Sequence, residues 1–383
     1  MTVPKRTIQI SVPMTGEDEW QACREPLMSG WLTQGPKVAA FEKAFGERHS
    51  VKYSLATTSC TTALHLILAA MDIGPGDEVI VPAFTWIATA NVVLYCGAMP
   101  VLADVDPHTY NIEPEEIARR LTPRTRAVIV VHLFGLCADM DAIRAVVPDG
   151  VKIIEDAACA AGATYKGVSA GGLGDAAAFS FHPRKSVTTG EGGMVTTNDE
   201  ALAKTADMLR NHGASVSEEQ RHSGPRPYLL PDFNLLGFNY RMTDLQGAVG
   251  LVQLSKLDKF IAERQEGAEF YCRELADLGW LRMPVVPNTG RHAWQAFVTT
   301  VDPKTAPMPR NALMEKLQQA GISTRPGTHA LHTSGYYSKR YGLTPQDYPG
   351  ARDCDANTMA IPLHNRMTAE DYRYIVDTIK AMS

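Results

Sequence analysis

Two residues able to form a catalytic pair follow neighbouring apolar runs of the chain. Asp156 lies in VKIIEDA (151–157), and Lys185 follows the next long run, AAAFSFH (176–182), within FSFHPRKSVTTGEGG. A buried carboxylate is costly unless it meets a cation, and a lysine beside a buried charged group readily gives up the proton that imine chemistry must remove. Taken alone, Asp156 could instead cap a helix or pair with an arginine, and Lys185 could be a solvated loop residue.

Small hydroxylated residues accompany this pair. Ser180 offers a hydroxyl to a phosphate, and the turn TTGEGG (188–193) lets the backbone approach a ligand closely. The stretch ATTSCTTALHLIL places Ser59, Thr61 and Thr62 at the start of a helix, where hydroxyl and free N–H groups bind anions. An ordinary helix N-cap is the alternative for that stretch.

A tryptophan completes the set. Trp86 follows the run EVIVPA (78–83), where its indole could stack on a flat ring or pack into the core. A carboxylate for a pyridinium nitrogen, a lysine for an imine, a phosphate cradle and a stacking ring together indicate pyridoxal 5'-phosphate (PLP).

The sequence pattern around these residues predicts an α/β domain that would position them. Several apolar runs are apolar at nearly every position, as in strands buried on both faces of a mostly parallel sheet, and the segments TALHLILAAMD, TANVVLYCGA and PEEIARRL have helical spacing suited to crossovers. Ligands of such sheets bind beyond the carboxyl ends of the strands. The predicted strands cover residues 51–57, 78–83, 99–105, 126–134, 151–157, 176–182 and 193–198.

The pattern changes after about residue 250. One long helix is predicted over 243–278, followed by a strand in WQAFVTTVD, a helix around RNALMEKLQQAG and a last helix in TAEDYRYIVDTIKAM. We therefore expect a large domain with an N-terminal arm over residues 1–250 and a smaller α+β domain over 251–383. The segment 213–234 has little periodicity and is predicted to be a functional loop.

Composition narrows the function classes. The net charge of -5 and the absence of a polybasic stretch argue against nucleic acid as a partner. The first residues lack the apolar region of a signal peptide, and no apolar stretch is long enough to span a bilayer. Seven scattered cysteines without a CxxC pair indicate a cytoplasmic protein with reduced thiols, without a disulfide framework or a metal site.

These pieces resemble the DegT/DnrJ/StrS family of sugar aminotransferases within the fold-type-I PLP enzymes. The resemblance covers nearly the whole chain, and the order and spacing of its motifs carry it. They are GWLTQGPKVAAFE (30–42), VPAFTWIATAN (81–91), VHLFG (131–135), IIEDAACAAGATYKG (153–167), GDAAAFSFHPRKSVTTGEGGMV (174–195), LLGFNYRMTDLQGA (235–248) and the terminal IPLHNRMTAEDYRYIV. The fold it implies has a large domain with a mostly parallel seven-stranded sheet and a smaller C-terminal domain.

The resemblance also implies roles for single residues. Lys185 would hold PLP as a Schiff base and carry the proton between substrate and cofactor, and Asp156 would pair with the pyridinium nitrogen. Trp86 would stack on the ring. The phosphate would be held by Ser180, by the backbone of Thr61 and Thr62, and by Asn239 of a partner subunit, which makes a homodimer with shared active sites.

Two positions depart from the family pattern. Cys159 stands where the family commonly has a glutamine that contacts the phenolic oxygen of the cofactor, and a thiol replaces it only weakly. Cys60 stands where a glycine is usual in the phosphate turn, which removes that residue's conformational freedom.

The activity implied is transfer of an amino group from L-glutamate or L-glutamine to a keto-sugar. The acceptor would be a nucleotide-linked 4-keto-6-deoxy sugar, or a 3-keto sugar, in amino-sugar biosynthesis for a surface polysaccharide or a secondary metabolite. Candidate substrate contacts are Arg221 and Arg226 for a diphosphate, Arg325 for a carboxylate and His329 for a hydroxyl. For each of these, a solvated loop or an ordinary surface or core position is the alternative.

Three other readings share the fold. Sugar dehydratases that resemble this pattern have histidine in place of the lysine, so Lys185 argues against them. A desulfurase needs a mobile reactive cysteine, and Cys159 is expected beside the cofactor on a strand end. A non-catalytic regulatory relative would have no need of the intact Lys185 and Asp156 pair.

Overall fold

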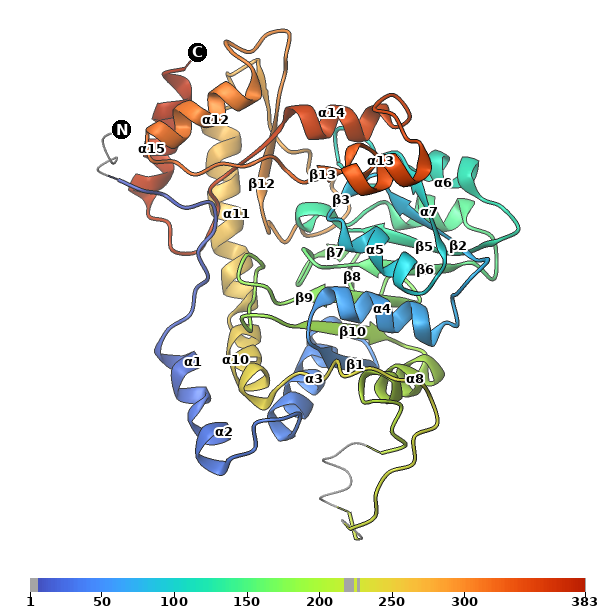
Figure 1. Cartoon of the computed structure of the whole chain (residues 1–383). Helices are drawn as coiled ribbons and strands as arrows, with labels where there is room; N and C mark the ends of the chain where they lie inside the picture. The colour runs from blue at the N-terminus through green and yellow to red at the C-terminus, as the bar shows by residue number, and fades with distance from the viewer. Residues whose placement is uncertain (1–5, 217–223, 226–227, 383) are drawn as a thin grey trace.

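The centre of the protein is a seven-stranded sheet with the strand order β1-β10-β9-β6-β5-β2-β4 (Figure 1). The computed structural model describes residues 6–216, 224–225 and 228–382. All strands of this sheet except β10 point the same way. The seven predicted strands are all confirmed, although most end earlier than expected, as β1 (Tyr53–Thr57), β2 (Glu78–Pro82), β4 (Met99–Ala103), β5 (Thr125–Val131), β6 (Lys152–Asp156), β9 (Ala176–Ser180) and β10 (Gly193–Thr197).

Helices bury both faces of this sheet, which explains why its strands are apolar throughout. Along β5, Ala127 and Ile129 belong to one core cluster and Val128 and Val130 to the other. The first cluster includes residues of α4 (Cys60–Ala70), α5 (Ala88–Tyr95) and α8 (Glu200–Arg210). The second includes residues of α3 (Pro36–His49), α6 (Pro114–Arg120) and α7 (Met140–Val146). The alternation of side chains along each strand thus builds two cores, one on each face.

The single long helix predicted over 243–278 is wrong in one respect. The structure has two helices there, α10 (Asp244–Ser255) and α11 (Leu257–Glu274), separated at Lys256. The side chain of Lys256 reaches back to Glu19 of α1 (Glu17–Ala22) and to Asp18, at 2.8 and 2.9 Å. This anchor lies at the junction of the two helices, and apolar spacing on each side of it could not reveal the break.

A second, three-stranded sheet forms beyond these helices. Its strands are β11 (Leu281–Arg282), β12 (Phe297–Val301) and β14 (Thr358–Ile361), all antiparallel. A third core cluster joins it to α11, α12 (Arg310–Gln319) and α15 (Ala369–Lys380). Ile8 belongs to that cluster and bridges Ile322, so the N-terminal arm packs against the C-terminal part of the chain. A domain boundary at residue 250 stays a prediction.

Shorter elements link the two sheets and extend from them. Strand β3 (Phe84–Thr85) pairs with β13 (His329–Ala330) and so joins the region after β2 to the C-terminal part. The remaining elements are α2 (Arg24–Ser29), α13 (Gly335–Tyr341), α14 (Pro349–Asn357), the strands β7 (Thr164–Tyr165) and β8 (Val168–Ser169), and the 3-10 turns Leu133–Gly135 and Leu331–Thr333. Among the described residues, no helix has the length and apolar character needed to cross a membrane.

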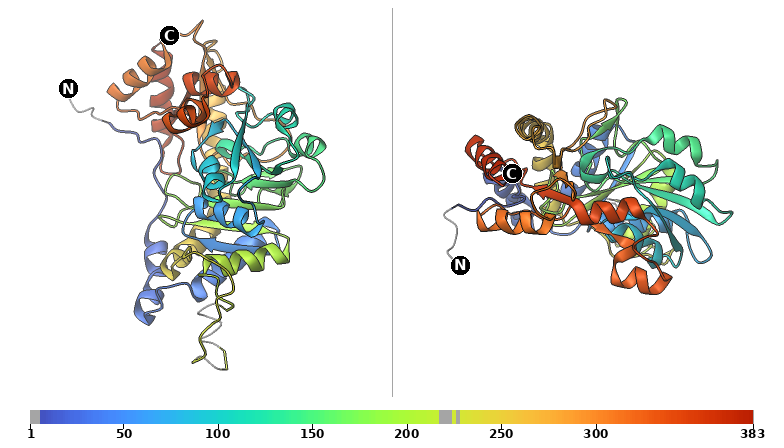
Figure 2. Two further views of the ribbon diagram at one scale, coloured as in Figure 1. Left: turned by 45° about the vertical axis from the view of Figure 1, so that its right-hand side comes forward. Right: turned by 90° about the horizontal axis from the view of Figure 1, so that it is seen from above.

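The segment after α8 stands away from the rest of the protein. In Figure 1 and in the left view of Figure 2, the yellow-green chain that leads back to α10 projects below the sheet. Its described residues form a loop, as predicted, with one antiparallel bridge between Ala214 and Phe233.

Candidate active site

Asp156 is the last residue of β6, and its carboxylate is 5 % exposed. It accepts hydrogen bonds from Thr89 Oγ1 at 2.8 Å and from the N–H of Ala158 at 3.2 Å. Burial raises the pKa of Asp156 above its ordinary value, and the hydrogen bond from Thr89 opposes that rise. Among the described residues no cation forms an ion pair with it. A buried carboxylate in this state fits the protonated nitrogen of a pyridine ring.

Lys185 follows β9, the strand that pairs with β6 in parallel, so its loop and Asp156 lie at the same end of the sheet. The N–H of Lys185 donates to the carbonyl of His182 at 2.9 Å, which bends the chain back toward the sheet. Its Nζ donates to Cys159 Sγ at 3.1 Å. The structure therefore brings the lysine, the aspartate and the unusual cysteine together.

The start of α4 has the shape of a phosphate cradle. Ser59 Oγ accepts from the N–H of Thr62 at 3.1 Å, while Thr62 Oγ1 accepts from the N–H of Ser59 at 3.0 Å. The N–H groups of Cys60 and Thr61 have no acceptor among the described residues. Two amides at a helix start are thus free for an anion, whereas the amide of Thr62 is already bonded within the helix cap.

Ser180 reaches this cradle through the register of the sheet. It ends β9 opposite Gly193 of β10, and Gly193 lies opposite Thr57 of β1. A Cβ at Gly193 would lie 2.4 Å from the carbonyl carbon of Ser59. The glycine therefore lets β10 pass against the start of α4, and this close approach places Ser180 one strand from the free amides.

Trp86 is 60 % exposed, so its alternative assignment to the core is wrong. It follows β3, and its ring centroid lies 5.6 Å from that of His329, with 51° between the ring planes. His329 is exposed and pairs with Thr85 across β3 and β13. An indole and an imidazole thus stand side by side on the surface, free to contact a ligand.

Of the three arginines predicted to contact the substrate, the structure describes only Arg325. Arg325 is partly buried, and its Nε has no hydrogen-bond partner among the described residues. Burial lowers the pKa of Arg325 below its ordinary value, and the charge of Arg184 adds to this effect. Arg221 and Arg226 lie outside the described residues.

Asn239 is exposed, and its side chain forms no hydrogen bond among the described residues. The backbone on either side of it is fixed by the end of α8: the N–H of Phe238 donates to Leu209 and that of Tyr240 to Arg210. The rings of Phe238 and Tyr240 are stacked 4.9 Å apart. A rigid segment therefore presents the amide of Asn239 to solvent, where a partner subunit could meet it.

Sequence reasoning missed Thr89. Its hydroxyl lies between Asp156 and the hydroxyl of Thr85, which is 3.1 Å away. The spacing of Thr85 and Thr89, one helical turn apart beside Trp86, was the available signal. It also missed the contact of Cys60, whose Sγ is 4.0 Å from the same carboxylate.

Other polar residues of the motifs stabilise the scaffold. Glu155 is fully buried, accepts N–H groups from Gly171, Leu173 and Gly174, and contacts His132 Nε2 at 2.9 Å. Such complete pairing explains how a charged side chain is tolerated there.

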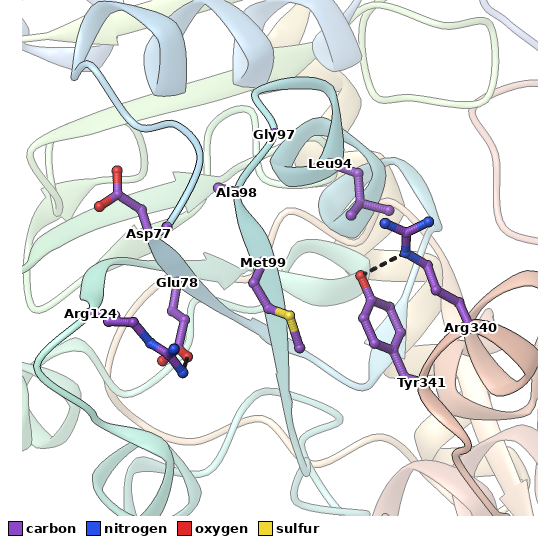
Figure 3. Close-up of a pocket in the computed structure, with 10 residues that line it drawn as sticks. Asp77, Glu78, Leu94, Gly97, Ala98, Met99, Arg124, Arg340 and Tyr341 are labelled. Carbon is purple, nitrogen blue, oxygen red and sulfur yellow. Dashed lines mark hydrogen bonds and ion pairs between the residues drawn. The ribbon is translucent and has the colours of Figure 1, made fainter.

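A cavity of about 340 Å³ lies at the other end of the sheet (Figure 3). It is lined by Asp77 and Glu78 at the start of β2, by Met99 at the start of β4, and by Arg340 and Tyr341. Lys185 and Asp156 follow the carboxyl ends of strands parallel to these. This cavity is therefore separate from the candidate active site.

Comparisons with known proteins identify the family of the chain. The model of the DegT/DnrJ/EryC1/StrS aminotransferase family matches residues 13–380. The chain is 40 % identical over 372 residues to the spore coat polysaccharide biosynthesis protein SpsC of Bacillus subtilis, covering 97 % of this chain and 95 % of the relative. It is also 40 % identical to the GDP-perosamine synthase of Caulobacter vibrioides, covering 96 % of each.

Solved structures give the same result. The PLP form of the Streptococcus pneumoniae protein Spr1654 superposes with a TM-score of 0.91 at 29 % identity, covering 98 % of each chain. That protein was also solved in a PMP form, with a TM-score of 0.91 at 28 % identity.

Proposed function

The chain belongs to the DegT/DnrJ/EryC1/StrS aminotransferase family, and on this premise we propose that it aminates a keto-sugar attached to a nucleoside diphosphate. The amino donor is L-glutamate or L-glutamine. The family match and the similar solved structures confirm three predictions from the sequence: the family, the fold-type-I class and PLP-dependent aminotransferase activity.

One observation carries the proposed chemistry: a buried carboxylate without a cationic partner and a lysine lie at the same end of the sheet. Bound PLP supplies an electron-withdrawing ring that stabilises negative charge at the carbon losing its proton. Asp156 keeps the ring nitrogen protonated. Lys185 anchors the cofactor and then moves the proton at the reacting carbon, because its flexible side chain reaches both positions.

The other residues hold the cofactor in place. The free amides at the start of α4, with Ser180, bind the phosphate through oriented N–H and O–H groups. Trp86 covers one face of the ring. Cys159 would face the phenolic oxygen of the cofactor, where its thiol would make a weaker contact than the amide common in this family.

The acceptor we favour is a nucleotide-linked 4-keto-6-deoxy sugar, with a 3-keto sugar as the alternative. The relative from Caulobacter vibrioides bears the name of a GDP-linked sugar, and SpsC is named for polysaccharide biosynthesis. Exposed Trp86 and His329 form a wall on which a sugar ring can lie. Arg325, an arginine predicted to bind the substrate, has an Nε without a hydrogen-bond partner among the described residues.

We further propose a homodimer in which Asn239 reaches the phosphate of the partner's site. Apolar side chains near Asn239 are far more exposed than a monomer usually allows, with Leu236 at 95 % and Leu230 at 82 %. Tyr228 and Phe233 of the same loop are exposed as well, at 76 % and 61 %. A second copy of this chain would bury them and set Asn239 into its active site.

The test begins with the colour of the holoenzyme. The purified protein with PLP should show a yellow absorption band that L-glutamate bleaches, and borohydride should attach the cofactor to Lys185, as read by peptide mass. Lys185→Ala should lose both, whereas Lys166→Ala, an exposed lysine paired with Asp141, should keep both. Normal turnover of glutamate by Lys185→Ala would contradict the proposal. A panel of nucleotide-linked 4-keto and 3-keto sugars, assayed by 2-oxoglutarate released, then identifies the acceptor.

A further inference from the structure

Two arginines from distant parts of the chain share one cavity beside Lys185. Arg184 immediately precedes Lys185, and Arg325 is held by backbone hydrogen bonds to Ala360 of β14, at 2.8 and 3.3 Å. Both line a narrow cavity together with Ser11 and Gln295. The backbone of Arg184 is itself fixed there, because Gln295 Nε2 donates to its carbonyl at 2.8 Å.

Neither guanidinium has an acidic or hydrogen-bonding side-chain partner among the described residues. Two like charges in proximity repel each other, and the partial burial of Arg325 adds a desolvation penalty. Consistent with this, burial and the charge of Arg184 both lower the pKa of Arg325. An arrangement of this kind is stabilised when an anion binds between the two groups.

The enclosed space is about 10 Å³, enough for one water molecule. An anion must therefore bind over the mouth of the cavity, where Arg184 is exposed. Arg184 immediately precedes Lys185 in the chain and lines the same cavity as Arg325, so both arginines lie on the Lys185 side of the site, where the donor must approach.

We propose that Arg184 and Arg325 form the amino-donor subsite and select L-glutamate over L-glutamine. This inference rests on the proposed function. Arg325 binds the α-carboxylate, which both donors share, and Arg184 binds the γ-carboxylate, which glutamine lacks. Two guanidinium groups match the two carboxylates of glutamate, whereas the neutral amide of glutamine would leave Arg184 unpaired.

The position of the pair favours a donor over the sugar nucleotide. The keto carbon of the acceptor must also reach Lys185, and a sugar ring then separates it from the diphosphate. Cations that adjoin Lys185 in the chain and in space are too close to that carbon to hold a diphosphate, but they suit carboxylates on a small amino acid.

The experiment measures the donor half-reaction of the holoenzyme by the bleaching of its absorption band. The native enzyme should favour glutamate over glutamine in rate divided by KM by about tenfold or more, since one charge-assisted hydrogen-bonded pair is at stake. Arg184→Gln should raise the KM for glutamate by about tenfold to a hundredfold and leave glutamine nearly unchanged, so that the preference is lost. Arg325→Lys should weaken both donors alike, because it keeps the charge but loses the planar fork.

A binding measurement separates this subsite from turnover. Glutarate should bind the native holoenzyme in calorimetry and bind Arg184→Gln about tenfold more weakly or worse. Arg352→Gln, an exposed arginine paired with its neighbour Asp353, serves as the matched control and should behave as native. An equal loss with both donors in Arg184→Gln, or a change only in the KM of the nucleotide sugar, would overturn the donor assignment. Absence of bleaching with either donor would instead contradict the proposed function.

Discussion

The hydrogen bond from Thr89 tunes the pKa of Asp156, the carboxylate proposed to hold the pyridinium proton. Asp156 is buried, and burial raises its pKa, while the Thr89 hydroxyl stabilises the charged form and lowers it. In the proposed role, only the charged form holds a pyridinium proton, so we expect activity to fall as pH falls through this pKa. Thr89 lies within the motif VPAFTWIATAN (81–91) but was assigned no role from the sequence, and the structure links it to the central carboxylate.

Thr89→Val should therefore move the acidic limb of activity to higher pH. Valine has nearly the same shape, but it leaves the carboxylate without its donor, and the loss of one hydrogen bond to a charged group corresponds to about one pH unit or more. The measurement is the pH profile of the glutamate half-reaction. Thr85→Val, whose hydroxyl touches Thr89 rather than Asp156, should shift the limb less. An unshifted limb in Thr89→Val would show that Asp156 does not titrate in it.

Cys159 gives a second prediction at the same scale. A thiol is a weak hydrogen-bond donor, so Cys159→Ala should change the dissociation constant of PLP by less than about threefold. Cys159→Gln, which restores the residue common in the family, should tighten PLP about threefold to tenfold, because an amide N–H donates more strongly to the phenolic oxygen. Titration of the apoenzyme with PLP measures both. A large loss in Cys159→Ala would show that the thiol, held 3.1 Å from Lys185, contributes more than a weak contact.

At the scale of elements, the cofactor pocket depends on how closely β10 and α4 approach. Gly193→Ala would place a Cβ 2.4 Å from the carbonyl carbon of Ser59 and 2.5 Å from its oxygen, so one element must move. We expect a loss of about 1–3 kcal/mol in the free energy of unfolding and a weaker affinity for PLP. Gly279→Ala meets no atom within 4 Å and should change neither. Thermal unfolding with and without PLP tests both variants. If Gly193→Ala had the stability and PLP affinity of the native protein, the close contact between β10 and the start of α4 would not limit the residue at this position.

The last turn of α3 carries a buried histidine that links stability to pH. His49 is 1 % exposed and stacks on Phe45, and burial lowers its pKa to about 4. The unfolded chain binds a proton near pH 6.5, so the contribution of His49 is complete above that pH and is lost as pH falls from about 6.5 to about 4. Over this range it amounts to about 3 kcal/mol at most.

His49→Gln should accordingly flatten the decline of stability between pH 6.5 and 4, even if its stability at neutral pH is lower. Chemical denaturation at a series of pH values measures the slope. His108→Gln, which replaces an exposed histidine, should keep the native slope. An unchanged slope in His49→Gln would mean that other groups account for the acid sensitivity.

The elements also show what the sequence could predict. Apolar runs identified every strand of the large sheet, because burial on both faces leaves no polar position to interrupt the pattern. The same pattern placed Asp156 and Lys185 at strand ends. It could not locate Thr89, which contacts Asp156, or the cavity shared by Arg184 and Arg325, because both bring together segments far apart in the chain. Nor could helical spacing reveal the break at Lys256, where a long-range ion pair with Glu19 is formed.

At the scale of the whole molecule, the proposed homodimer would complete the site of each chain. In that proposal the free amides of α4 and Ser180 hold the phosphate from one side, while Asn239 is exposed on a segment fixed by backbone hydrogen bonds and follows a loop with exposed apolar side chains. A two-fold dimer makes each chain both donor and recipient of this residue. In the proposed dimer, burial of the exposed apolar side chains would stabilise the association, and the amide of Asn239 would supply the remaining contact to the phosphate.

Mixing two inactive variants tests that arrangement. Asn239→Ala should retain Lys185 but hold PLP poorly, and Lys185→Ala should retain Asn239 but lack the catalytic amine. In a mixed dimer, the subunit with Lys185 receives an intact Asn239 from its partner, so one site is whole. After dissociation and reassociation at equal amounts, about a quarter of the native activity should return, since about half of the dimers are mixed and each has one complete site. Native mass spectrometry of the mixture, with the two variants carrying tags of different mass, measures how far subunits exchange. No recovery despite confirmed exchange would mean that Asn239 serves the active site of its own chain.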